Sequence, residues 1–226
     1  MGLWMALTGW LLFAGFHIGL SAEPVRSQLV GKMGEKGFQG FYSLIALITF
    51  GLLIAGFVLS DTSAMPVFDA GAAVSWMGHI ASLLMLLAFI LLFAGFANPS
   101  PMGMAPTKLE AHGIIRITRH PMNMAFALFG LSHLLVNRLP VDWIFYLGFV
   151  LFGVLSSMHQ DKKKIRQGGQ DYQNFVDSTS ILPFGAIVTG KQPLKLSEIS
   201  KAGLLLGIVG TVVARILHPT MMAQLF

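Results

Sequence analysis

The sequence predicts an all-α protein, a polytopic transmembrane helix bundle of about six spans with both termini outside. The first observation is composition: 54% of the 226 residues are hydrophobic and only 11% are charged, whereas soluble domains are about a quarter charged. The second is a series of long apolar runs. The third is an alternation of basic and nearly uncharged connections between these runs. Together they predict a single transmembrane domain over residues 1–226 that is surrounded by membrane lipid.

The apolar runs give the positions of the expected helices. A bilayer core needs about 20 helical residues, with about 17 as a practical lower limit. The fourth run is shorter than this, so its helix is expected either to start before Pro121 or to tilt little. The six runs cover residues 3–20, 41–59, 74–97, 122–136, 141–158 and 202–217.

The connections between the runs give the orientation. Segments 21–40, 98–121 and 159–201 contain three, three and seven Lys or Arg residues, respectively. Segment 60–73 has none, the turn at 137–140 has one, and none follows the last run. Cytoplasmic loops are the basic ones, so these three connections are predicted to be cytoplasmic.

Two segments need separate interpretation. The first run resembles a signal peptide in length, but no Lys or Arg precedes it, so we interpret it as a retained span. Segment 159–201 is the only sizeable connection. Within it, Gly168 and Gly169 are expected to interrupt any continuous helix. The following stretch "ILPFGAIV" is too short to cross the membrane and is expected to lie in the interface or fold back against the bundle.

The chain has no cysteine, which excludes disulfides and thiolate ligands and leaves histidine as the candidate ligand for any metal. The predicted topology sorts the seven histidines by membrane depth. Ligands of one centre must share a depth, so only histidines of the same group can form one site. The cytoplasmic-side group is His17, His112, His120 and His159, and the outer group is His79, His133 and His218.

Most histidines at span ends are interfacial, and His112, His159 and His218 are interpreted in this way. His17 differs because it lies inside the apolar stretch "LLFAGFHIGL", where a polar ring usually marks a function or an interhelical hydrogen bond. His120 directly precedes Pro121, which suits the first turn of a helix. The histidine is therefore placed at the membrane boundary.

The stretch "RITRHP" also contains two arginines, Arg116 and Arg119. They are explained equally well as charges that set the topology or as ligands for an acidic group such as a propionate or phosphate, because residues at i and i+3 share a helical face. The sequence pI of about 9.7 does not indicate nucleic-acid binding, because the basic residues cluster beside apolar runs.

Several stretches resemble a known family. "FHIGL" with "GEKGFQGFYSL", "HGIIRITRHPMN" and "TSILPFGAIVTGKQ" are similar to the NnrU family of bacterial membrane proteins and to its plant and cyanobacterial branch, 15-cis-zeta-carotene isomerase. The resemblance covers nearly the whole chain. It implies a multi-pass protein of the bacterial inner (cell) membrane.

The isomerase branch implies haem b held by two axial histidines and a redox-switched action on a carotenoid, a hydrophobic substrate. Carried over by motif, the ligands fall on His17 and His120. Our own hypothesis adds that Arg116 or Arg119 pairs with a haem propionate at the cytoplasmic edge. Ile18 stands where the branch has a serine or another small residue, so membership does not by itself imply isomerase activity. The family name implies a context of nitric oxide and nitrite metabolism in denitrifying bacteria.

Two alternatives belong to other functional classes. "RHP" opening a membrane helix also resembles S-adenosylmethionine-dependent membrane methyltransferases of the isoprenylcysteine and phospholipid type. Those enzymes have two glutamates where this chain has Gln160 and Asp161, which removes the expected contact with the cofactor's amino group. The other alternative is a non-catalytic haem-binding membrane subunit that acts through a partner.

Overall fold

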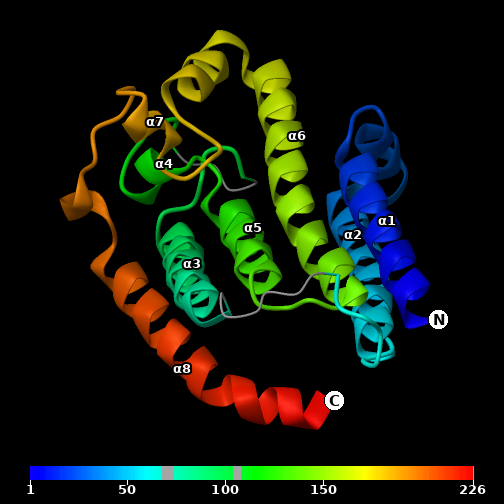
Figure 1. Ribbon diagram of the computed structural model, residues 1–226. Helices are drawn as coiled ribbons and strands as arrows, with labels where there is room; N and C mark the ends of the chain where they lie inside the picture. Colours follow the sequence, from blue (N-terminus) through cyan, green and yellow to red (C-terminus); the bar gives the residue numbers. More distant parts are fainter. Residues whose placement is uncertain (68–73, 104–107, 226) are drawn as a thin grey trace. The chain divides into compact units, whose positions relative to one another are not determined.

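The computed structural model describes residues 1–67, 74–103 and 108–225, and every regular element in these ranges is a helix. The predicted all-α class is therefore confirmed. Figure 1 shows the helices in chain order. Their bounds are α1 (Gly2–Ser21), α2 (Val25–Val58), α3 (Val74–Ala97), α4 (Ile114–Ile117), α5 (Pro121–Leu134), α6 (Pro140–Ser178), α7 (Gly185–Val188), the 3-10 helix η2 (Leu196–Glu198) and α8 (Lys201–Leu225).

Within these ranges, five helices are long and apolar enough to cross a bilayer: α1, α2, α3, α6 and α8. The remaining expected span corresponds to α5, which has 14 residues. It rises about 21 Å, against about 30 Å for the hydrocarbon core. Pro121 fixes the start of α5, and the chain leaves the helix after Leu134. The described residues therefore contain five helices long enough to span, and the sixth expected span is the shorter helix α5. The orientation of the termini stays a prediction.

α2 starts earlier than the expected span 41–59. It begins at Val25, so three basic residues expected in a connection lie on the helix instead. Gly34 interrupts the helix with φ 73° and ψ 167°, a conformation that is readily available only to a residue without a Cβ. The helix thus consists of a short polar segment before Gly34 and an apolar segment after it.

The chain divides into two compact units. The N-terminal unit is Met1–Gly71 with Asn137–Gly148, and the C-terminal unit is Ala72–Val136 with Phe149–Phe226. In the N-terminal unit, α1 and α2 lie side by side (Figure 1). Their backbones approach closely, because a Cβ on Gly56 would lie only 2.3 Å from the backbone nitrogen of α1. Small residues allow this kind of contact between membrane helices.

Trp10 joins α1 to the beginning of α6 within the N-terminal unit. Its Nε1 donates a hydrogen bond of 3.1 Å to the carbonyl oxygen of Phe145. The Phe145 ring stacks on Phe57 of α2, with 4.3 Å between centroids. Gly148 makes room for the indole, since a Cβ there would lie 2.1 Å from the Trp10 ring. The buried indole N–H is therefore satisfied, as a low-dielectric environment requires.

In the C-terminal unit, α3 packs against both α5 and α8. Glycines bring α8 close to α3: a Cβ on Gly203 would lie 2.6 Å from the Cα of Ala94, and one on Gly207 would lie 2.7 Å from the Cα of Ile90. The buried core of this unit is apolar and is formed mainly by Leu91, Ala94, Met102, Ile114, Ile115, Ile117, Met124 and Phe175.

The connection between α6 and α8 folds back onto the C-terminal unit. α6 bends at Gly169, which has φ 60° and ψ −138°, so the expected interruption at the glycine pair is confirmed. After Ser178 the chain forms α7, where Ala186 is buried. Of the two arrangements expected for "ILPFGAIV", the structure has the one in which the segment packs against the rest of the bundle.

Candidate functional site

The stretch "RITRHP" is held in place by backbone hydrogen bonds to the segment after α6. α4 ends at Ile117, whose carbonyl oxygen accepts a hydrogen bond of 2.8 Å from the N–H of Phe184. The N–H of Arg119 donates to the carbonyl oxygen of Ser180 at 2.9 Å. Two segments about sixty residues apart in the chain are thereby paired. The pairing fixes the backbone from which Arg119 and His120 project.

The side chains of Arg119 and His120 converge on one carboxylate, that of Asp161 in α6. The Nε of Arg119 lies 3.1 Å from both oxygens, and its Nη2 donates to Oδ2 at 2.6 Å. The Nε2 of His120 lies 2.7 Å from Oδ1. All three residues are buried, with 3–6% of their surface exposed. This buried cluster of Arg119, His120 and Asp161 is called the RHD cluster below.

Arg119 has further partners in the same unit. Its Nη1 donates to the carbonyl oxygens of Thr179 at 2.9 Å and Val176 at 3.3 Å. These carbonyls belong to the end of α6, where helix carbonyls lack intrahelical partners. The guanidinium therefore neutralises one carboxylate and also caps a helix end. Its donors are bound to acceptors of the chain.

The histidine ring of the RHD cluster has a defined orientation. An ionised carboxylate only accepts hydrogen bonds, so Nε2 of His120 carries the proton directed at Asp161. Nδ1 is then the basic nitrogen, and it makes no hydrogen bond with the residues that the structure describes. The backbone N–H of His120 donates to Thr118 Oγ1 at 3.2 Å. A carboxylate-bound imidazole is the arrangement that metal-ligating histidines usually have.

Arg116 belongs to a second ion pair. Its Nε and Nη2 donate to the two carboxylate oxygens of Glu198 at 2.7 and 3.1 Å, and its Nη1 donates to Gln192 Oε1 at 2.6 Å. The backbone N–H of Gly113 also donates to Glu198, at 3.1 Å. The hydrogen bonds from Arg116 are the main cause that lowers the pKa of Glu198 to about 2. This pair fastens η2 to α4.

His17 lies on α1 in the N-terminal unit and is half-buried. Its ring packs between two aromatic rings, with centroids 5.3 Å from Phe13 and 5.0 Å from Tyr42. The Tyr42 hydroxyl donates to the backbone oxygen of His17 at 3.2 Å. α1 and α2 are thus joined around this histidine.

The structure brings two of the four residues predicted for the site, Arg119 and His120, onto one acceptor. It places Arg116 in a separate ion pair and His17 in the other compact unit, so the prediction that His17 and His120 bind one haem stays a prediction. Sequence reasoning did not identify Asp161 or Glu198 as partners. The available signal was that each arginine beside an apolar helix needs an acid, but spacing does not say which one.

Comparisons with known proteins agree on one family. A family model described as "NnrU protein" matches residues 5–224. A relative named "15-cis-zeta-carotene isomerase, chloroplastic" from Arabidopsis thaliana is 27% identical over 227 residues, covering 96% of this chain and 60% of the relative. One of the same name from Zea mays is 25% identical over 192 residues, covering 81% of this chain and 50% of the relative. The chain therefore spans between half and three fifths of these relatives. No solved structure matches it.

Proposed function

The chain belongs to the NnrU family, and from this premise we propose that it is an isomerase-like membrane enzyme that changes the configuration of a double bond in an apolar polyene such as a carotenoid. The observation that carries the proposal is the similarity to relatives named as 15-cis-zeta-carotene isomerase over 96% of the chain. Five apolar helices make it a membrane protein, so a lipid-dissolved substrate has direct access to it. Isomerisation needs no second substrate, because no atom is gained or lost.

Haem b is the cofactor that we propose for this chain. A bound haem would supply the redox-switched iron that weakens a π bond and permits rotation about it. Tested against the residues, His120 fits as an iron ligand through Nδ1, because Asp161 fixes the ring by its other nitrogen. His17 is suited to be the second iron ligand, because its side chain is an imidazole and lies in an apolar helix.

The chain's own residues have positioning roles in this proposal. Asp161 orients the His120 ring through Nε2, which leaves Nδ1 for the ligand, and Arg119 neutralises the Asp161 carboxylate. Arg119 and Arg116 are each bound to a carboxylate of the chain. Contact of either arginine with a haem propionate would therefore require an exchange of partners, which makes positioning the better-supported role.

The experiment uses the full chain purified in detergent and then placed in liposomes with 15-cis-zeta-carotene in the dark, with and without a reductant. Absorption spectra measure haem, and chromatography measures the ratio of cis to trans product. We expect a low-spin ferric spectrum, because two imidazoles leave no open iron position. We also expect conversion of the 15-cis substrate. His17→Ala and His120→Ala should lose both signals.

The matched control is His79→Ala, which removes an imidazole from the predicted outer group and should keep the spectrum and the conversion. Haem without conversion would support a haem-binding subunit over an isomerase. No Soret band, or a band that His79→Ala alone abolishes, would refute the ligand assignment. A role in nitric oxide or nitrite metabolism is a separate proposal, and a spectral shift of the haem band upon nitric oxide addition would support it.

The methyltransferase alternative is less well supported by the site. Asp161 stands in the place of a cofactor-binding glutamate, but both of its oxygens accept hydrogen bonds from Arg119, and Oδ1 also contacts His120. A carboxylate held in this way is not available to the amino group of S-adenosylmethionine. We therefore favour the isomerase-like function.

A further inference from the structure

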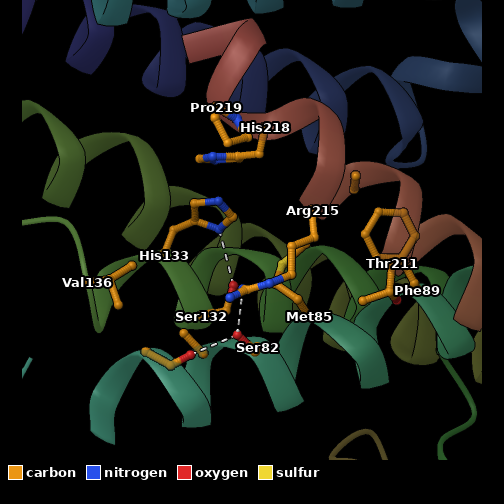
Figure 2. A pocket seen from close by; sticks show the side chains of 13 residues that line it. Ser82, Met85, Phe89, Ser132, His133, Val136, Thr211, Arg215, His218 and Pro219 are labelled. Atoms are coloured by element: carbon orange, nitrogen blue, oxygen red, sulfur yellow. Dashed lines mark hydrogen bonds between the residues drawn. The ribbon is translucent and has the colours of Figure 1, made fainter. Parts of the chain in front are cut away.

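A second candidate site lies in the C-terminal unit, at the opposite end of α5 from the RHD cluster. It is a pocket of about 530 Å³ between the first half of α3, the end of α5 and the last part of α8. This volume is in the range of small-molecule sites. Met85, Phe89 and Val136 supply apolar walls. Figure 2 shows Ser82, Ser132, His133, Arg215 and His218 converging among them.

Arg215 is the feature that needs an explanation. It lies in the candidate span Lys201–Pro219, about 21 Å along the helix axis from Lys201. Its Nη1 donates one hydrogen bond of 3.2 Å to Ser82 Oγ. Among the residues that the structure describes, no carboxylate lies within ion-pair distance of it. The side chain is exposed and lies near the outer end of the predicted run 202–217, and an arginine that faces the apolar part of a bilayer is costly unless an anion accompanies it.

Two other arginines of this unit show the contrast. Arg116 and Arg119 each have a bidentate carboxylate partner from the chain itself. A guanidinium has five N–H donors in a fork that matches a carboxylate or phosphate. At Arg215 most of these donors are not bound to the described part of the chain. The missing acid is therefore expected to come from a ligand.

The surrounding side chains indicate the sign and the chemistry of that ligand. His133 and His218 face each other across the pocket, with 6.3 Å between ring centroids. His133 is held by its Nδ1, which lies 2.9 Å from the carbonyl oxygen of Phe129 and 3.1 Å from Ser132 Oγ. The described residues of the lining include no Asp or Glu. Its polar groups thus favour an anion, and its apolar walls favour a hydrocarbon chain.

Snorkelling is the alternative explanation for Arg215. Its long side chain would then reach the membrane surface simply to find water. Under the predicted orientation this end of the unit is the outer side, where topology does not require a basic residue. The hydrogen bond to Ser82 also directs the guanidinium toward α3 and into the pocket (Figure 2).

We propose that this pocket binds an acidic amphiphile from the bilayer, with its carboxylate or phosphate held by Arg215 and its apolar chain against Met85 and Phe89. The ligand class is an oxyanion joined to a hydrocarbon chain. A neutral carotenoid lacks the oxyanion, so this site is separate from the proposed isomerase function.

The test measures equilibrium binding of radiolabelled oleate to the full chain in phosphatidylcholine nanodiscs, with partitioning into protein-free nanodiscs subtracted. We expect saturable binding to the unmodified protein. Arg215→Gln should raise the Kd at least about tenfold, the scale of a lost charge-assisted hydrogen bond. Arg215→Lys should fall between the two, since it keeps the charge but loses the fork. Lys201→Gln, which removes a charge from the other end of α8, should bind like the unmodified protein.

A second variant tests the cavity independently of the charge. A Cβ on Gly78 would meet no atom within 4 Å, so Gly78→Phe can fill the pocket without a backbone clash. It should weaken oleate binding while keeping Arg215. Circular dichroism and a single elution peak check that the variants are folded, and Gly78→Phe keeps the test decisive if Arg215→Gln does not fold.

Competition experiments separate an amphiphile from a free anion. Oleyl alcohol, which has the chain without the acid, should not displace oleate at equal concentration. Inorganic phosphate in the millimolar range should not displace it either. Displacement by phosphate would show a site for free anions and overturn the amphiphile assignment. Equal oleate affinity in Arg215→Gln and Lys201→Gln, or wild-type affinity in Gly78→Phe, would overturn the proposal.

Discussion

Replacing Asp161 by Asn should destabilise the protein far more than an ordinary surface substitution. The change keeps the size of the side chain but removes the charge that faces Arg119 and His120. Arg119 then remains buried, with 6% of its surface exposed, without a counter-ion. A buried cation without its partner cannot be hydrated, so the cost is that of an unpaired charge.

The magnitude follows from the contacts. Asp161 receives three contacts from the guanidinium, at 3.1, 3.1 and 2.6 Å, and one from the imidazole at 2.7 Å. Removal of one partner from a buried pair costs about 3–5 kcal/mol. The carbonyls of Val176 and Thr179 still solvate Arg119 in part. We therefore expect a loss near the lower end of that range.

The assay is reversible unfolding in mixed micelles, with the free energy of unfolding as the readout. The matched control is Asp171→Asn, an exposed acid after the bend of the same helix, which should change the free energy by less than about 0.5 kcal/mol. A double variant, Arg119→Met with Asp161→Leu, should be more stable than either single change, because it removes both charges together. Equal free energies of unfolding for Asp161→Asn and Asp171→Asn would refute the reasoning.

Three further predictions concern pH, packing and topology. The pKa of Glu198 is about 2 instead of 4.5, so the stability that its ionised form contributes is complete above pH 4.5 and is lost as the pH falls toward 2. The difference in thermal stability between the wild type and Glu198→Gln should therefore shrink below about pH 4.5, and a constant difference down to about pH 3 would contradict this. Gly56→Leu should cost about 1–3 kcal/mol or more through overpacking, whereas Gly51→Leu, with open space at its Cβ, should not. A reporter fused after Gln167 should be cytoplasmic and one fused after Phe226 periplasmic, and the same compartment for both would show that α8 does not cross.

Features that depend on neighbouring residues could be predicted from the sequence. The run 74–97 matches α3 because a long apolar segment without breakers can satisfy its backbone in lipid only as a helix. The bend at Gly169 follows from the glycine pair, and the start of α5 follows from Pro121. The early start of α2 was not predicted. Its first part is polar, and a polar stretch that precedes an apolar helix and is continuous with it gives no hydropathy signal.

Features that depend on distant pairing could not be predicted. Asp161 is 42 residues from Arg119, and Glu198 is 82 residues from Arg116. In the sequence, Asp161 stood out only because membrane methyltransferases have a glutamate at the corresponding place. Choosing between the acids requires knowing that the segment after α6 folds back along "RITRHP", and that arrangement is fixed by backbone hydrogen bonds such as the one from Arg119 to Ser180.

Three arginines of the C-terminal unit, Arg116, Arg119 and Arg215, can be separated by the source of their counter-ions. Arg119 was expected to bind an acidic group because it adjoins His120, a candidate iron ligand. In the structure its donors are bound to a carboxylate and two carbonyls of the chain. Arg215 lies in an apolar run and was not weighed from the sequence, yet in the described part of the chain it has no acid. A buried ion pair within the chain holds structure, because exchanging its partner would leave a bare charge. A cation in an apolar helix that has no acid partner among the described residues is the better candidate for binding an acid from outside.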